Sequence, residues 1–253
     1  MDYNEKINGS LTLDELFAYW KEKDPGVITY ASEEGKIEKT VDHKRDYFIA
    51  DGIVNEDIWN SGNRKRILFV LKEAYGADWG TNTLATWLKN DHPSVAIWKR
   101  IAKWVNGIQN TNTDRVKRYE ERLSDSKHAE CLEQIAVMNL KKSGGVPQSN
   151  YSEIDAYADY DKMEIRKEFS LIDADIIICG ATFRCLLEKV FEQKIIASSS
   201  GKDNWYYFLN LDGKERLYID MYHPANRWPD LMNYYTVTNI YQQALIECNG
   251  RYK

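Results

Sequence analysis

The sequence predicts an α/β protein: a three-layer α/β/α fold with a central, mainly parallel four-stranded sheet. Three continuous apolar runs, at residues 66–71, 135–140 and 175–179, have the composition of strands that are buried on both faces. Stretches with helical periodicity separate these runs, and this alternation of strand and helix favours a parallel sheet between two layers of helices. We therefore expect one domain over residues 1–253, with its core at residues 66–247.

Residues 1–65 are predicted to be an N-terminal helix followed by irregular decoration. A hydroxyl residue at position 10 or 12 can cap a helix that ends at Asp24-Pro25-Gly26. Residues 27–65 are rich in charge and interrupted by glycine, so we expect them to be irregular. Further helices are expected at residues 94–106, 113–132, 161–172, 182–193 and 231–247.

The fourth principal strand is predicted at residues 216–222, where apolar residues alternate with polar and aromatic ones. Asp212-Gly213 indicates a hairpin that joins this strand to the run at residues 205–211. The strand leads into His223-Pro224-Ala225-Asn226-Arg227, which holds a titratable ring, an amide and a guanidinium. Because open α/β sheets bind ligands at the carboxyl ends of their strands, we expect a site where the loops after the four strands meet.

The composition argues against several classes of protein. The formal net charge is −5, so the chain lacks the overall positive charge that would drive tight non-specific binding to nucleic acid. A local basic rim is compatible with this net charge. The cysteines lack the spacing of a zinc site or an iron–sulfur cluster, so we expect reduced thiols in a cytoplasmic protein without metal or cofactor. Residues 1–10 are polar and no apolar run approaches about 20 residues, so neither a signal peptide nor a membrane span is expected.

Three polar residues near strand ends are candidate catalytic and base-reading groups. Glu73 follows the first strand, where partial burial would make it a plausible general base; the alternative is a solvated charge beside Lys72. Asn139 interrupts the second strand with an amide that could read the edge of a base or satisfy a backbone group. His223 could donate a hydrogen bond or carry a proton, or could be a loop histidine without a chemical role.

A second group of residues is suited to phosphate. Lys141, Lys142 and Ser143 begin a basic, glycine-containing loop after the second strand, for which the alternative is a flexible turn. Asn226 and Arg227 add groups that suit an anion or a base edge. The sequence contains no P-loop pattern and no dinucleotide fingerprint, so NAD binding is not expected.

Taken in order, these motifs resemble those of the uracil-DNA glycosylase superfamily, over roughly residues 64–247. Leu71-Lys72-Glu73-Ala74-Tyr75-Gly76 is similar to the first motif of the uracil-excising branch, Gly-Gln-Asp-Pro-Tyr-His. Val137-Met138-Asn139 is similar to the strand that carries the family's asparagine. Ile177-Ile178-Cys179-Gly180-Ala181 and His223-Pro224-Ala225-Asn226 are similar to the third strand with its glycine turn and to the His-Pro-Ser motif. Each motif is short, and the resemblance depends on their co-linear order.

The resemblance implies an enzyme that hydrolyses the bond between DNA sugar and uracil or another damaged base, with the base flipped into a pocket. Glu73 would position the water or stabilise the cationic sugar, and His223 would hydrogen-bond the departing base. Asn139 would read the base edge, and Tyr75 and Gly76 would belong to the base-binding part of the pocket. DNA or a nucleotide is then the expected partner.

Two other interpretations stay open. The same pocket could hold a nucleotide or a modified base without cleaving it, as a binding module. An unrelated α/β-hydrolase-like enzyme would need a Gly-x-Ser-x-Gly motif, which the sequence does not contain. Trp79 and Trp87 are the candidate aromatic residues for stacking on a bound base.

Overall fold

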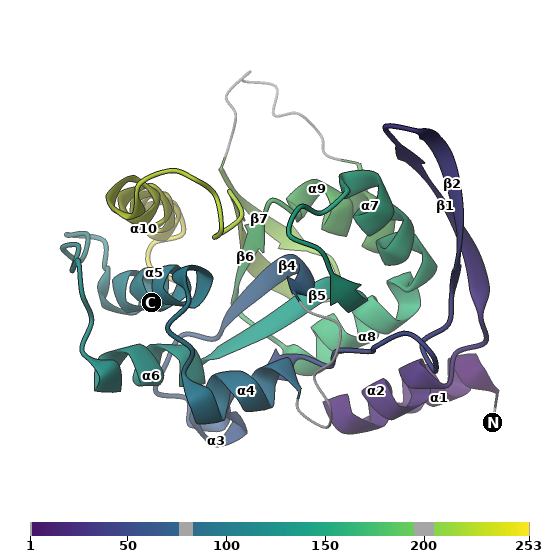
Figure 1. Ribbon diagram of the computed structural model, residues 1–253. Helices are drawn as coiled ribbons and strands as arrows, with labels where there is room; N and C mark the ends of the chain where they lie inside the picture. The colour runs from purple at the N-terminus through teal and green to yellow at the C-terminus, as the bar shows by residue number, and fades with distance from the viewer. Residues whose placement is uncertain (1, 76–82, 195–204, 253) are drawn as a thin grey trace.

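A six-stranded sheet forms the centre of the computed structural model, which describes residues 2–75, 83–194 and 205–252 (Figure 1). Its strands are Gly52–Ile53 (β3), Ile67–Tyr75 (β4), Ile135–Gly145 (β5), Ile176–Gly180 (β6), Tyr206–Asn210 (β7) and Glu215–Met221 (β8). Their order across the sheet is β3-β5-β4-β6-β8-β7. The four inner strands run parallel, and the two edge strands β3 and β7 run antiparallel to their neighbours.

The α/β class and the parallel centre of the sheet are therefore confirmed, but the four-stranded sheet is a correction, since the sheet is mixed. The run that forms β7 was expected only as a hairpin arm, and the two residues of β3 are too few to give a pattern. A basic loop was expected at residues 141–145, but β5 continues through them and stays paired with β4 as far as Gly145.

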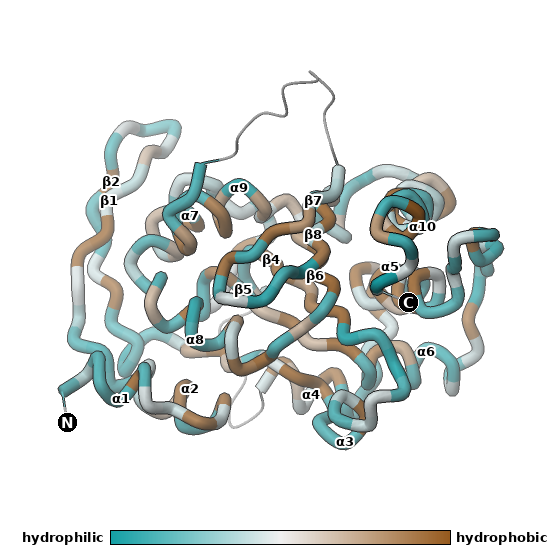
Figure 2. Tube along the Cα trace, turned by 180° about the vertical axis from the view of Figure 1, so that it is seen from behind, coloured by the Kyte–Doolittle hydropathy of each residue, from teal (hydrophilic) through white to brown (hydrophobic). Residues whose placement is uncertain are grey.

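Helices cover both faces of the sheet and give the predicted three layers. One layer consists of Leu84–Asp91 (α4), Ala96–Asn110 (α5), Asp125–Glu133 (α6) and Asp230–Glu247 (α10). The opposite layer consists of Tyr3–Gly9 (α1), Leu13–Lys21 (α2), Glu56–Asn60 (α3), Tyr151–Tyr160 (α7), Lys162–Ile172 (α8), Phe183–Cys185 (α9) and the π-helical turn Leu186–Val190 (η1). Alternation along β4 sends Ile67 and Phe69 into the first core and Leu68 and Val70 into the second. Figure 2 shows hydrophobic residues along these central strands.

Residues 27–65 are only partly irregular, because strands and a short helix occupy much of the range that was predicted to lack them. Gly26–Ser32 (β1) and Gly35–Val41 (β2) form an antiparallel hairpin that stands beside α7 and is separate from the main sheet (Figure 1). In the hairpin, only Ile28 and Val41 join the local apolar cluster as buried residues. Because most of the hairpin faces solvent, its charged residues hide the alternation that would identify strands.

The helix predicted at residues 113–132 is wrong over its first half. Residues 111–124 have no regular secondary structure, and α6 begins after Ser124, whose Oγ accepts a hydrogen bond from the backbone N–H of Lys127 at 3.2 Å. The first half is charged and lacks the apolar face through which helices are stabilised by packing. Helix α7 was not predicted either. None of the helices in the described part of the chain is long and apolar enough to cross a membrane.

Candidate functional site

The carboxyl ends of β4, β5, β6 and β8 meet at one side of the sheet, which we call the carboxyl edge. Leu71 of β4 lies opposite Asn139 of β5, and β6 lies between β4 and β8. A Cβ atom on Gly180 would lie 2.8 Å from Leu71 Cδ2 and 3.6 Å from the Cα atom of His223. The strand order thus places Gly180 and His223 beside Leu71, two residues before Glu73, whereas Asn139 lies opposite Leu71 inside β5, which continues to Gly145.

His223 follows β8 and carries an uncharged ring. The backbone N–H of Ala225 donates to His223 Nδ1 at 3.2 Å, so the proton of the neutral ring is on Nε2. Burial, with a smaller contribution from the charge of Lys72, lowers the pKa of His223 to about 4. Within the described residues nothing accepts a hydrogen bond from Nε2. At neutral pH the ring is therefore an uncharged hydrogen-bond donor.

Residues 223–229, which we call the His-Pro loop, are held in place by Arg100 of α5. Arg100 Nη1 donates to Pro224 O at 2.6 Å and to Asn226 O at 2.7 Å. Its Nη2 donates to Trp228 O at 3.1 Å. A planar guanidinium presents several donors in a fixed geometry, so one side chain can fix three carbonyl groups of the loop. Arg100 was not identified from the sequence, because 124 residues separate it from Pro224.

Asn226 stabilises the same loop. Its Nδ2 donates to His223 O at 2.8 Å and to Asn233 Oδ1 at 3.0 Å, and its Oδ1 accepts from the backbone N–H of Trp228 at 2.9 Å. With its amide used internally, Asn226 does not fit its predicted contact with an anion or a base edge. Arg227 is exposed, and its guanidinium is available to a ligand.

Glu73 is shielded from solvent. Its Oε2 accepts from Lys141 Nζ at 2.7 Å, and the two side chains are 4% and 3% exposed. Lys141 Nζ also lies 3.4 Å from Glu153 Oε1 of α7. A Cβ atom on Gly145 would come within 2.5 Å of Glu73 Cγ, so the strand packs closely over the carboxylate. Oε1 of Glu73 has no partner among the described residues, whereas Lys141 is not available to the phosphate predicted for it.

Asn139 is oriented by Asp51, a residue that the sequence did not single out. Asp51 Oδ2 accepts from the backbone N–H of Asn139 at 2.7 Å and from its Nδ2 at 3.0 Å. Asn139 Oδ1 is then left without a partner in the part of the chain that is described. Lys142 Nζ lies 2.5 Å from Asp51 Oδ1 and 2.7 Å from Glu168 Oε2, and both ion pairs are inaccessible to solvent. In this arrangement Lys142 belongs to a buried ion cluster and does not reach a phosphate.

The charge balance of the Asp51–Lys142–Glu168 cluster decides its protonation. Burial alone would lower the pKa of Lys142, but Asp51 and Glu168 outweigh it and the pKa is raised. Burial raises the pKa of Glu168 well above its usual range; Lys142 opposes that rise and Asp51 adds to it. A single ammonium balances only one carboxylate, and the raised pKa of Glu168 is the direction that this imbalance requires.

The other predicted residues differ from one another in exposure and in position. Tyr75, the last residue of β4, is 70% exposed, and Ser143 Oγ is buried without a partner among the described residues. Trp87 of α4 packs against the core on its own side of the sheet. Gly76 and Trp79 lie outside the described residues.

Asp220 of β8 is a further titratable group near this edge that was not identified as a candidate. Burial raises the pKa of its carboxyl group to about 6. It lies opposite Cys179 in the strand register, and its backbone N–H donates to Trp205 O at 2.9 Å. A signal was present in the sequence, because an acidic residue inside an otherwise buried strand is unusual.

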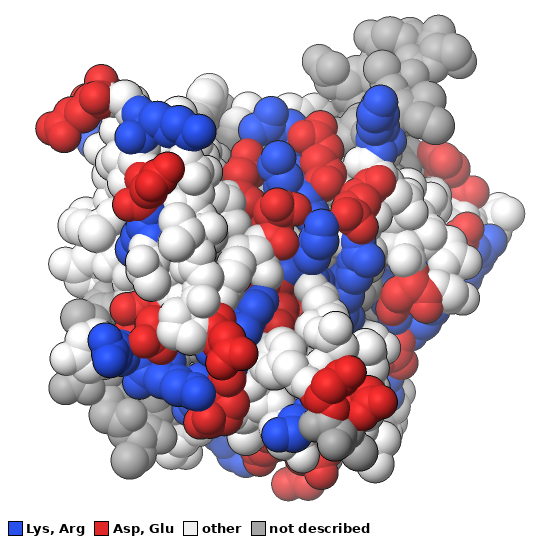
Figure 3. Space-filling view, turned by 90° about the vertical axis from the view of Figure 1, so that its right-hand side faces the viewer, with Lys and Arg blue, Asp and Glu red and all other residues white. Residues whose placement is uncertain are grey.

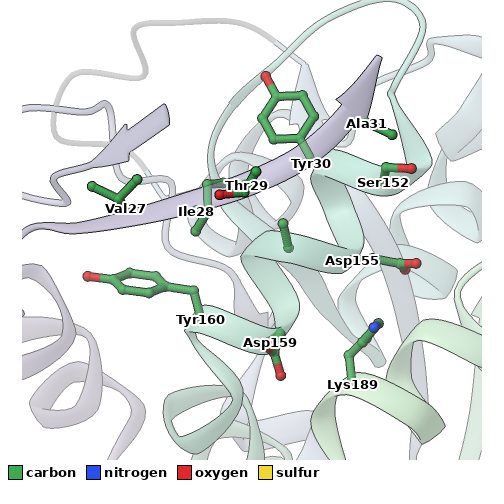
Figure 4. Close-up of a pocket in the computed structure, with 11 residues that line it drawn as sticks. Val27, Ile28, Thr29, Tyr30, Ala31, Ser152, Asp155, Asp159, Tyr160 and Lys189 are labelled. Atoms are coloured by element: carbon green, nitrogen blue, oxygen red, sulfur yellow. The ribbon is translucent and has the colours of Figure 1, made fainter. Parts of the chain in front are cut away.

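A pocket of about 470 Å³ lies between β1 and α7 and contains none of the predicted site residues (Figure 4). Asp155 and Asp159 of α7 and Lys189 of η1 are among its lining side chains. Figure 3 shows acidic and basic side chains interspersed over the face that carries the β1–β2 hairpin. That face lacks the single-sign basic surface on which phosphate binding depends.

No model of a known protein family matches the sequence, and no curated protein matches it either. The resemblance to the uracil-DNA glycosylase superfamily therefore stays an expectation based on short motifs. The function of this chain has to be inferred from its fold and from the chemistry of the carboxyl edge.

Proposed function

We propose that this protein is a DNA glycosylase-like hydrolase that cleaves the N-glycosidic bond of uracil or another damaged base in DNA, at the carboxyl edge of the sheet. The observation that carries the proposal is His223, whose ring is uncharged, bears its proton on Nε2 and sits on a loop fixed by Arg100. We place the protein in the cytoplasm, because its four cysteines are free thiols.

The chemistry of base excision calls for such a group. As the N-glycosidic bond breaks, negative charge develops on the departing base and positive charge on the sugar. A preorganised donor stabilises the charge on the base without reorganisation at the moment of reaction, and one donor of this kind contributes about 100- to 1000-fold to the rate. The lowered pKa of His223 keeps the ring in this form throughout the neutral range.

Two buried oxygens on adjacent strands are suited to the remaining tasks. Glu73 Oε1 and Asn139 Oδ1 both lack partners among the described residues, and β4 and β5 are neighbours. The carboxylate oxygen could accept a hydrogen bond from the attacking water or stabilise the cationic sugar. The amide oxygen could accept an N–H from the edge of the base. Arg227, exposed in the His-Pro loop, is the remaining candidate for a phosphate contact.

A binding module is the second candidate function, and the ion pair of Glu73 favours it. A hydrolase needs this carboxylate at the sugar or at a water, whereas here it is 4% exposed and paired with Lys141 at 2.7 Å. Binding alone would require only the donor of His223 and the amide of Asn139. A nucleotide-dependent rise in melting temperature without base release would identify such a module.

The decisive experiment measures base release from oligonucleotides that carry uracil, hypoxanthine or an alkylated base, scored as alkali-labile sites. We expect release from at least one lesion, and Glu73→Gln should slow it by at least about 100-fold. Glu153→Gln is the matched control, because it removes the other carboxylate near Lys141 but lies on α7; it should leave the rate unchanged. The absence of base release from every lesion would exclude the proposed hydrolase activity.

A further inference from the structure

Three exposed aromatic rings form a connected cluster beside His223. Trp205 and Tyr222 have ring centroids 5.4 Å apart, and Tyr222 and Trp228 are stacked with centroids 6.4 Å apart and planes inclined by 12°. The three side chains are 38%, 45% and 53% exposed, respectively. Large aromatic residues usually bury most of their area, so an exposed connected set indicates a binding surface. We call Trp205, Tyr222 and Trp228 the aromatic platform.

The platform is rigid and adjoins the carboxyl edge. Tyr222 precedes His223 directly, and the backbone of Trp228 is fixed at both its carbonyl and its N–H by Arg100 at 3.1 Å and Asn226 at 2.9 Å. Rings that are already fixed in place lose little entropy when a ligand stacks on them.

Positive charge accompanies these rings. Arg227 directly precedes Trp228 in sequence and is exposed, and Lys72 is near enough to His223 to lower its pKa. Aromatic faces interleaved with cations are the chemistry that proteins use to hold the bases and phosphates of a single strand. In a duplex the bases stack on one another, so their faces are not open to protein side chains.

We propose that the aromatic platform stacks on unpaired bases of single-stranded DNA and so makes a single strand the preferred substrate. This inference rests on the proposed function in that it treats the single strand as a substrate, but the binding that it describes does not depend on cleavage. The bases on the platform would be neighbours of the nucleotide held at His223, because Tyr222 and His223 are consecutive.

The test is fluorescence anisotropy with labelled oligothymidine of about 12 nucleotides, which offers no damaged base to cleave, and with the matching duplex. Trp228→Ala and Tyr222→Ala should each weaken single-strand binding by about 5- to 100-fold and leave the weak duplex binding unchanged. Trp228→Phe, which keeps an aromatic face, should recover most of the affinity. The control Tyr47→Ala removes a ring that is 58% exposed on the segment between β2 and β3 and should have no effect.

Equal affinity for single strand and duplex, or unchanged binding by both alanine variants with normal melting temperatures, would overturn the inference. So would a dimer of the free protein that Trp228→Ala dissociates in sedimentation, because the platform would then be an interface between copies. The outcomes of this test can be distinguished from those of the base-release assay. Single-strand binding without base release would support the aromatic platform but not the hydrolase. Base release from duplex DNA that is insensitive to Trp228→Ala upholds the hydrolase alone.

Discussion

Replacing Lys142 with methionine tests the buried ion cluster that orients Asn139. Lys142 pairs with both Asp51 and Glu168, and all three side chains are inaccessible to solvent. Lys142→Met keeps much of the length of the side chain and removes its charge. The two acidic side chains are then left in the interior without a cation.

The loss of a buried ion pair sets the size of the destabilisation. Breaking such a pair by removing one partner costs about 3–5 kcal/mol, because the remaining charge is left in the interior without compensation. We therefore expect Lys142→Met to lower the free energy of unfolding by about 3–4 kcal/mol.

Urea unfolding at neutral pH, followed by tryptophan fluorescence, measures this difference. Lys36→Met, which removes an exposed lysine of β2, should leave the stability unchanged. The double variant Lys142→Met/Asp51→Asn removes the cation together with the anion and should recover most of the loss. A Lys142→Met variant within about 1 kcal/mol of the native protein at neutral pH would refute this account of the ion cluster.

Three further outcomes are expected at the carboxyl edge. Because the pKa of His223 is lowered from 6.5 to about 4, this ring binds fewer protons in the folded protein than in the unfolded chain between about pH 4 and 6.5. The contribution of His223 to stability should therefore rise with pH across this interval, opposite in sign to that of Asp220, whose pKa is raised to about 6. In urea titrations the difference between the native protein and His223→Phe isolates this contribution, which should be about 2 kcal/mol, allowing for partial exposure of the ring. Gly180→Ala would place a Cβ atom 2.8 Å from Leu71 and 3.0 Å from Pro224, so calorimetry should show about 1–3 kcal/mol of destabilisation, and base release should slow. Arg100→Met should increase hydrogen exchange in the His-Pro loop and slow base release by at least about 10-fold, with little change where α5 packs on the sheet.

The core strands could be predicted because a strand that is buried on both faces requires a run of consecutive apolar residues. β4, β5 and β6 are apolar on both faces, and only the centre of a parallel sheet buries both faces of a strand. The β1–β2 hairpin and α7 gave no such signal. Most of the hairpin faces solvent, and α7 carries charged side chains such as Glu153, which pairs with Lys39 of β2 at 2.9 Å and with Lys141 of β5 at 3.4 Å. Charge along the chain was therefore interpreted as irregularity or as exposed helix.

For the candidate site, the sequence indicated positions but not pairings. The places of Glu73 and His223 near the ends of β4 and β8 follow from the apolar runs and the parallel order of the strands, whereas Asn139 lies inside β5, which is longer than its apolar run. Their partners lie far away in the chain: Lys141 is 68 residues from Glu73, and Asp51 is 88 residues from Asn139. Lysines that follow an apolar strand look like loop residues until tertiary structure supplies carboxylates opposite them, and so the predicted phosphate contacts of residues 141 and 142 do not fit the arrangement found.

The donor on the ring of His223 is best tested by removing it while keeping the shape of the ring. His223→Phe should slow single-turnover release of the excised base at neutral pH by about 100- to 1000-fold. The control is His92→Phe, which alters the other histidine that precedes a proline. The ring of His92 is paired with Glu133 of α6, so this variant should excise the base at the native rate. An unchanged rate for His223→Phe would contradict the account, because no donor on that ring could then be stabilising the departing base.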